Sequence, residues 1–317
     1  MRKRLIAAIG MLSVVLTSGC ALNSSGPGQA AAPAADGALK GVSVNVGSKE
    51  FTEQLLLCEI TAQRLESQGA SVKRTCGMSG SSAVRSALVS GAIDTYWEYT
   101  GTGWLTHLQQ TETINDPAVM YSKLSALDKS KNNIVWLPPA SADNTYAIAV
   151  KSETAKKLGV STISDYAKLT KTDPASASFC GASELFGRDD GWPGLKKAYG
   201  FDLPKDKVAE LAEGPIYNAV AKGNPCNFGE AFATDGRIAA LGLTVLTDDK
   251  HFFPPYNLSL NVRAAVLDKN PKIKTIMDPI SKLLSTTELQ KLNAQIDVDG
   301  KTPEEVASTW LSANKLK

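Results

Sequence analysis

Short alternating segments and longer segments with helical periodicity follow one another along most of the chain. Residues 42–46 (Val-Ser-Val-Asn-Val) alternate as a half-buried strand does, and residues 52–65 carry apolar side chains at helical spacing. A strand at residues 71–75, a helix at residues 82–90 and a strand at residues 92–96 continue the series. This order predicts an α/β fold in which helices flank a mostly parallel sheet.

Two segments without periodicity, residues 138–144 and 247–256, interrupt this series, and each contains a double proline. Proline continues neither a helix nor a central strand. We therefore interpret these segments as crossings between two lobes. The first lobe then comprises residues 41–143 and 252–317, and the second lobe comprises residues 144–251.

The remaining pattern places further elements in both lobes. Strands are predicted at residues 134–137, 146–150 and 258–262, and helices at residues 272–284 and 287–296. A last helix begins with a capping box, in which Thr302 is the cap, Pro303 the first helical residue and Glu305 the third.

The N-terminal segment has the composition of an export signal. Basic residues precede an apolar run that is shorter than the roughly 20 residues needed to span a bilayer. Residues 1–19 are therefore predicted to be a secretory signal peptide. Cys20 follows small residues, as in a bacterial lipobox, and is the predicted lipidation site; an ordinary cleaved signal with an incidental cysteine is the alternative. Residues 20–40, mostly Ala, Gly, Pro and Ser, predict a flexible tether.

Charge gives no indication of a nucleic-acid partner. The chain has 34 Lys and Arg against 32 Asp and Glu. Removal of residues 1–19 takes away three basic residues and leaves 31 against 32, a net charge of −1. The mature chain therefore lacks the basic excess that is typical of nucleic-acid-binding proteins.

Four cysteines follow the predicted lipidation site: Cys58, Cys76, Cys180 and Cys226. An exported chain folds in an oxidising compartment, where disulfides form. Four cysteines allow three pairings. We favour 58–76, the pair nearest in sequence, together with 180–226; free buried thiols are the alternative.

The sequence offers little for catalysis or metal binding. Its two histidines, His107 and His251, have no second histidine or cysteine pair at the spacing of metal ligands. Residues 77–81 (Gly-Met-Ser-Gly-Ser) do not form the Gly-x-Ser-x-Gly motif of a nucleophile elbow. We therefore expect no metal, no cofactor and no enzymatic activity. Lys49 lies at the carboxyl end of the first predicted strand, where ligands bind to open α/β sheets.

An aromatic cluster at residues 96–102 (Tyr-Trp-Glu-Tyr-Thr-Gly-Thr) is unusual in a chain with 7% aromatic residues. The face of an aromatic ring carries negative quadrupole density. It attracts cations that have no hydrogen-bond donor, such as quaternary ammonium groups. The cluster predicts a site for such a cation.

Five sequence blocks resemble those of the bacterial glycine betaine/choline (osmoprotectant) substrate-binding proteins of ABC importers, in the same order. They are Gly-Ser-Lys-Glu-Phe-Thr-Glu-Gln at 47–54, Glu-Tyr-Thr-Gly-Thr at 98–102, Asp-Gly-Trp-Pro-Gly-Leu at 190–195, Thr-Asp-Gly-Arg-Ile at 234–238 and Asp-Lys-His-Phe-Phe-Pro-Pro-Tyr at 249–256. The similarity extends over residues 41–312.

The resemblance implies a two-lobed periplasmic-binding-protein (Venus flytrap) fold, with the ligand in the cleft between the lobes. It places the rings of an aromatic box at Tyr99, Tyr146, Phe232 and Tyr256, and the partners of a ligand carboxylate at Lys49, Thr102 and Arg188. The family usually has tyrosine at the position of Phe232. Two acids follow Arg188 directly, so an ion pair within its own loop is the alternative to a ligand contact.

The function implied is that of a lipid-anchored, exported receptor facing the periplasm or cell exterior. It would close over glycine betaine, proline betaine, choline or carnitine as a monomer. It would then deliver the ligand to a separate permease with a cytoplasmic ATPase. The alternatives are the same fold with another solute, such as a trimethylated histidine derivative or an uncharged aromatic molecule, an exported enzyme, and an envelope scaffold.

Overall fold

The computed structural model describes residues 37–112 and 114–317. The predicted signal peptide, Cys20 and most of the predicted tether lie outside these residues. The last residues of that tether pack onto the fold, because Leu39 is buried and its N–H donates to the Gln68 carbonyl (2.8 Å). Ordered structure therefore precedes the first predicted strand.

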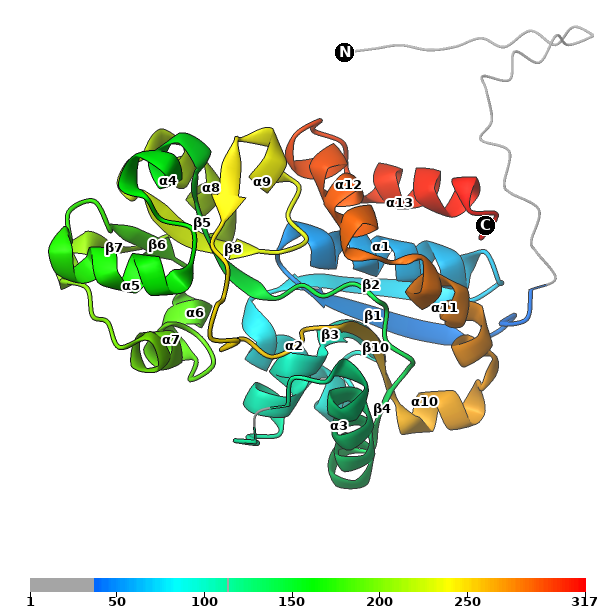
Figure 1. The fold of residues 1–317 in the computed structure, drawn as a ribbon. Coiled ribbons are helices and arrows are strands. Elements are labelled where there is room, and N and C mark those ends of the chain that lie inside the picture. The colour runs from blue at the N-terminus through cyan, green and yellow to red at the C-terminus, as the bar shows by residue number, and fades with distance from the viewer. Residues whose placement is uncertain (1–36, 113) are drawn as a thin grey trace, which may run out of the picture. The chain divides into compact units, whose positions relative to one another are not determined.

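The first sheet has five strands in the order β2-β1-β3-β10-β4 (Figure 1). The strand β1 (Ser43–Lys49) runs parallel to its neighbours β2 (Ser71–Met78) and β3 (Thr95–Tyr99). The strand β10 (Leu258–Arg263) is antiparallel to β3 and to β4 (Ile134–Trp136).

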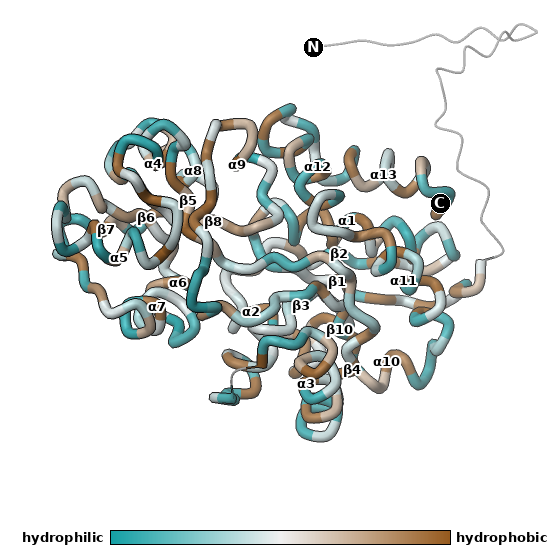
Figure 2. The backbone as a smooth tube through the Cα atoms, viewed as in Figure 1, coloured by the Kyte–Doolittle hydropathy of each residue, from teal (hydrophilic) through white to brown (hydrophobic). Residues whose placement is uncertain are grey.

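The second sheet has five strands in the order β7-β6-β8-β5-β9. The strand β6 (Phe179–Gly181) runs parallel to β7 (Val208–Glu210) and β8 (Phe228–Phe232). The strand β5 (Tyr146–Lys151) is antiparallel to β8 and to β9 (Leu243–Val245). Figure 2 shows apolar segments along β5 and β8, inside this sheet.

The two-lobed α/β fold expected from the sequence is confirmed, but both sheets are mixed: each has one strand that runs antiparallel to its two neighbours. Both exceptions follow a predicted crossing: β5 is the first strand after one, and β10 is the first strand after the other. A strand that returns through a helix within its own sheet is held parallel by the crossover. A strand that enters from the other lobe is free of that constraint.

Helices flank both sheets. Those beside the first sheet are α1 (Thr52–Glu66), α2 (Gly80–Ser90), the π-helix η1 (Thr102–His107), α3 (Pro117–Asn132), α10 (Ala264–Lys269), α11 (Lys272–Leu283), α12 (Thr286–Asp297) and α13 (Pro303–Ala313). Those beside the second are α4 (Ser152–Leu158), α5 (Ile163–Thr172), α6 (Ser183–Gly187), α7 (Trp192–Tyr199), the 3-10 helix η2 (Lys205–Lys207), α8 (Glu213–Lys222) and α9 (Arg237–Ala240). Among the described residues, no helix has the length and apolar character needed to cross a membrane.

Two helices illustrate how local sequence determines the fold. The apolar face predicted for α1 is buried, with Leu56, Ile60 and Leu65 packed between the first sheet and α13. The capping box predicted for α13 is present, because Thr302 accepts from the Glu305 N–H and Glu305 accepts from the Thr302 N–H.

Two disulfides link neighbouring elements, one in each lobe. Cys58 of α1 is bonded to Cys76 of β2, and Cys180 of β6 is bonded to Cys226 just before β8. Their Cα atoms are 6.4 and 5.8 Å apart. The structure therefore contains the pairing favoured from the sequence.

The two crossings lie side by side between the sheets. Asp143 and Asn257 form an antiparallel bridge, and the Asn144 N–H donates to the Tyr256 carbonyl (3.1 Å). The Asp143 carboxylate accepts from the Tyr256 N–H (2.8 Å). Asn144 and Tyr256 are thereby held next to each other at the junction of the lobes. The residues at which one lobe passes into the other stay a prediction.

Candidate ligand-binding site

All seven site residues implied by the resemblance line one small cavity, which we call the aromatic cavity. They are Lys49, Tyr99, Thr102, Tyr146, Arg188, Phe232 and Tyr256. They come from both sheets, from η1, from the loop after α6 and from the second crossing. The volume of this cavity is about 20 Å³, room for about one water molecule. The rings therefore close directly on one another.

Strand pairing positions the rings. Tyr146 at the start of β5 lies opposite Phe232 at the end of β8, and their ring centroids are 5.1 Å apart. Tyr256 meets Tyr146 edge to face, at 5.7 Å and 87°. Tyr99 is the last residue of β3, a strand that begins three residues later than the sequence pattern suggested.

Phe51 is a fifth ring at the cavity, and it is not among the residues predicted from the sequence. It precedes α1 and lies between Tyr99 (6.3 Å, 20°) and Phe232 (5.5 Å, 13°). Its position in the block at 47–54 was an available signal. The Phe51 ring therefore occupies the space between the rings of Tyr99 and Phe232.

Two of the tyrosine hydroxyls donate hydrogen bonds to carboxylates. Tyr99 donates to Glu53 (2.7 Å) and Tyr256 donates to Asp190 (2.7 Å). Burial raises the pKa of the phenols of Tyr99, Tyr146 and Tyr256 well above the ordinary value. The three phenols are therefore neutral, and hydrogen bonds orient the rings of Tyr99 and Tyr256.

Lys49 is paired inside the protein. Its ammonium group donates to Glu98 (2.7 Å) and lies 5.0 Å from the centre of the Tyr99 ring. Glu98 also contacts the Tyr96 hydroxyl (3.0 Å) and the His107 ring (2.9 Å). Burial alone would raise the pKa of Glu98, but Lys49 and His107 lower it below its ordinary value. The positive charge of Lys49 therefore faces an ionised carboxylate.

Arg188 forms the ion pair that was the alternative to a ligand contact. Its guanidinium group donates to Asp190 through Nε (2.8 Å) and to Glu184 through Nη1 (2.9 Å). It also reaches the Thr102 hydroxyl (3.4 Å) and lies 5.6 Å from the centre of the Tyr146 ring. Arg188 thus adjoins the aromatic cavity with two carboxylates already bound to it.

Glu53 connects the cavity to the junction of the lobes. This buried carboxylate accepts from Tyr99 (2.7 Å), Asn144 (3.0 Å), Asn293 (3.2 Å) and Thr234. These donors belong to β3, to the first crossing, to α12 and to the loop after β8. Sequence reasoning missed Glu53, although it lies in the block at 47–54.

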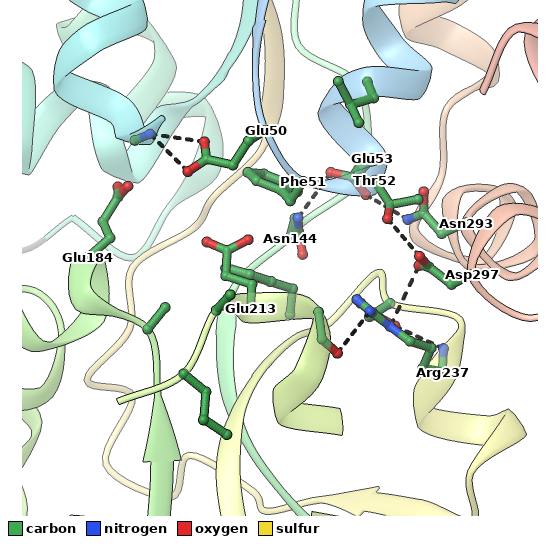
Figure 3. Close-up of a pocket in the computed structure, with 18 of the residues that line it drawn as sticks. Glu50, Phe51, Thr52, Glu53, Asn144, Glu184, Glu213, Arg237, Asn293 and Asp297 are labelled. Carbon is green, nitrogen blue, oxygen red and sulfur yellow. Dashed lines mark hydrogen bonds and ion pairs between the residues drawn. The ribbon is translucent and has the colours of Figure 1, made fainter. Parts of the chain in front are cut away.

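A wide cavity of about 620 Å³ adjoins the aromatic cavity (Figure 3). Phe51, Asn144, Glu184, Glu213 and Phe232 are among the residues that line both. The wide cavity is acidic, since Arg237 shares its wall with seven carboxylates: Glu50, Glu53, Glu184, Glu210, Glu213, Asp235 and Asp297. Its volume lies within the range of about 300–1,000 Å³ that is usual for ligand pockets.

Within residues 37–112 and 114–317, no group of three or more His, Cys, Asp or Glu side chains is arranged to hold a metal ion.

Two sheets joined by two crossings, with a ring-lined cavity at their junction, define a two-lobed solute-binding protein. A sequence profile described as the substrate binding domain of ABC-type glycine betaine transport systems matches residues 42–313. The chain belongs to this family of transport proteins.

Individual relatives cover nearly the whole chain. The glycine-betaine-binding protein of Pseudomonas aeruginosa is 35% identical over 89% of this chain and 91% of its own length. The carnitine transport binding protein OpuCC of Listeria monocytogenes is 30% identical over 99% of this chain and 98% of its own. A crystal structure described as a glycine betaine/carnitine/choline ABC transporter superposes with a TM-score of 0.69, at 30% identity, and covers 86% of this chain and 99% of the other.

Proposed function

We propose that the protein is the extracytoplasmic solute receptor of an ABC importer and binds a quaternary-ammonium osmoprotectant of the glycine betaine, proline betaine, choline or carnitine type. The observation that carries this proposal is the convergence of Tyr99, Tyr146, Phe232 and Tyr256 on one cavity from both lobes. Family membership and the named ligands of the relatives support it.

A trimethylammonium group has no hydrogen-bond donor, so it binds best against the faces of aromatic rings, which attract cations. Each ring contributes about 0.5–2 kcal/mol to such a contact. Micromolar affinity corresponds to roughly 8 kcal/mol. Four engaged rings therefore supply a large share of the binding free energy.

The carboxylate of a betaine would be held by Arg188, Thr102 and Lys49. Arg188 presents a planar fork that suits a carboxylate. In the arrangement described above this fork is bound to Asp190 and Glu184. A ligand carboxylate would therefore exchange with one of these partners.

Binding and closure of the lobes are coupled in this proposal, because Tyr99 and Tyr256 are supplied by the first lobe and Tyr146 and Phe232 by the second. A ligand that contacts both sets stabilises the closed arrangement. The receptor performs no chemistry and passes its ligand to a separate permease with a cytoplasmic ATPase. We further propose that it acts as a monomer, anchored to the membrane by lipid on Cys20.

The direct test is titration calorimetry of the purified protein with glycine betaine, proline betaine, carnitine and choline. Binding of at least one of them, with a matching rise in the unfolding temperature, is expected. No heat and no thermal shift with any of the four would refute the ligand class. Mass spectrometry of a molecule that copurifies with the protein would identify the solute.

A first variant tests the carboxylate contact. The Arg188→Ala change should weaken glycine betaine about tenfold or more, since a charge-assisted hydrogen bond contributes roughly 1.5–3 kcal/mol. Choline has no carboxylate and should lose much less affinity. Calorimetry on both ligands measures the difference, and Arg74→Ala, at a partly exposed arginine of β2, is the control. Equal losses for the two ligands would contradict the assigned role.

A second variant tests the box without removing a ring. A Cβ at Gly101 would lie 2.7 Å from Cε1 of Tyr256, although the backbone there (φ −60°, ψ −45°) accepts alanine. Gly101→Ala should therefore displace the Tyr256 ring and weaken the ligand about tenfold. Gly187→Ala has open space around its Cβ and is the matched control. Unchanged affinity in Gly101→Ala would exclude Tyr256 from the box.

A further inference from the structure

The charged groups around the aromatic cavity do not balance. Lys49 is paired with Glu98, and Arg188 is paired with Asp190 and Glu184. Each cation that lines this cavity therefore already faces at least one carboxylate. Two more carboxylates, Glu50 and Glu213, line the same cavity in addition to these pairs. Glu50 accepts hydrogen bonds from the Ser79 hydroxyl (3.1 Å) and the Gly80 N–H (2.9 Å).

Glu213 is the first residue of α8 in the second lobe, and it lines both the aromatic cavity and the wide cavity. Its Oε2 atom is buried and has no hydrogen-bond partner among the described residues. Figure 3 shows its side chain directed into the wide cavity, toward Phe51 and Asn144. A buried carboxylate oxygen without a partner is costly. A cation bound between the rings would offset this cost.

We propose that Glu213 is the counter-charge for the ammonium group of the ligand and sets the specificity of the site, favouring quaternary ammonium cations that lack a carboxylate, such as choline, over zwitterionic betaines. This inference rests on the function proposed above. A cation without a carboxylate gains the full attraction of Glu213. A zwitterion brings its own carboxylate into a cavity that Glu213 and Glu50 line in addition to the ion pairs, and the repulsion offsets part of that attraction.

The protonation of Glu213 determines when this preference applies. Burial, followed by the nearby carboxylates Glu184 and Glu50, raises its pKa to about 7, against the opposing influence of Lys49 and Arg237. Glu230 of β8 also faces it, and the Glu230 carboxylate has a pKa raised by burial and by Glu213. Below about pH 7 Glu213 is protonated and the preference for choline is lost; above that pH it is ionised and the preference is present.

The experiment is calorimetric titration of the full chain with choline and with glycine betaine, at about pH 5.5 and about pH 8.5. Neither ligand has a group that titrates in this range. In the wild type, the ratio of choline affinity to betaine affinity should rise about tenfold from the lower to the higher pH. The Glu213→Gln variant has the same shape and should show a ratio that changes less than about twofold.

The control variant is Glu210→Gln. Glu210 is exposed and lines the wide cavity but not the aromatic cavity, so its loss removes an equal charge at a greater distance from the rings. In Glu210→Gln, the ratio of choline affinity to betaine affinity should change with pH as it does in the wild type. Identical behaviour of the two variants, or a wild-type ratio that does not change with pH, would overturn the role of Glu213. Failure of choline and glycine betaine to bind the wild type at either pH would overturn the role of Glu213, and failure of proline betaine and carnitine as well would refute the proposed function.

Discussion

The Tyr256→Ala variant should bind quaternary ammonium ligands at least about a hundredfold more weakly than the wild type, a difference of roughly 2.7 kcal/mol. Three contributions are lost together. The ring offers about 0.5–2 kcal/mol to the cation, and its edge-to-face pair with Tyr146 contributes about 0.5–1.5 kcal/mol to the shape of the box. Its hydroxyl also supports Asp190, which in turn holds Arg188.

The Tyr256→Phe variant separates these contributions, because it keeps the ring and removes only the hydrogen bond to Asp190. Its affinity should fall about fivefold or less, as expected for one net hydrogen bond. Calorimetry measures both variants, and circular dichroism establishes that each is folded. Wild-type affinity in Tyr256→Ala would show that the cation binds elsewhere.

The family resemblance selects four of the rings that line the aromatic cavity, and each lies in or near a quoted block or begins a predicted strand. Tyr99 and Tyr256 lie in quoted blocks, and Tyr146 begins a predicted strand. Phe51 was equally available but was not selected, since the role of a ring before a helix depends on what packs across the junction. Its partner Phe232 belongs to the other lobe.

The pairing of charges was less predictable than the positions of the rings. The ion pair of Arg188 with Asp190 is local, and the sequence offered it as an alternative. The pair of Lys49 with Glu98 joins two neighbouring parallel strands 49 residues apart. The environment of Glu213 could not be predicted from the sequence, because its neighbours Glu50 and Glu184 come from different lobes.

Most helices and strands could be predicted from the sequence, and the errors in their bounds and directions have physical causes. The strand at residues 92–96 was placed three residues early, because the apolar residues Ala92 and Ile93 resemble the start of a strand. They belong instead to the turn after α2, where the Asp94 N–H donates to the Asn45 carbonyl of the neighbouring strand (2.8 Å). The antiparallel direction of β5 and β10 follows from the crossings, which the pattern located without giving their direction.

The Glu53→Ala variant should lower the free energy of unfolding by about 3–5 kcal/mol, the cost expected when one member of a buried polar network is removed. Tyr99, Asn144, Thr234 and Asn293 would each lose a hydrogen bond to Glu53. Asn293 would keep its bond to the Thr234 carbonyl (3.0 Å). These four residues belong to elements of both lobes and to the first crossing. The change should therefore weaken the ligand as well as the fold.

Two further variants give this prediction its controls. Glu59→Ala, on the same helix, removes a partly exposed ion pair with Arg74 and should cost about 0–1 kcal/mol. Glu53→Gln keeps one acceptor oxygen but places an NH2 group against the hydrogen-bond donors of its neighbours. We therefore expect an intermediate decrease in the free energy of unfolding. Urea unfolding with and without ligand measures all three. If Glu53→Ala is no less stable than Glu59→Ala, the network does not hold the lobes together. If Glu53→Ala is less stable but binds the ligand with wild-type affinity, the network stabilises the fold and does not position the rings.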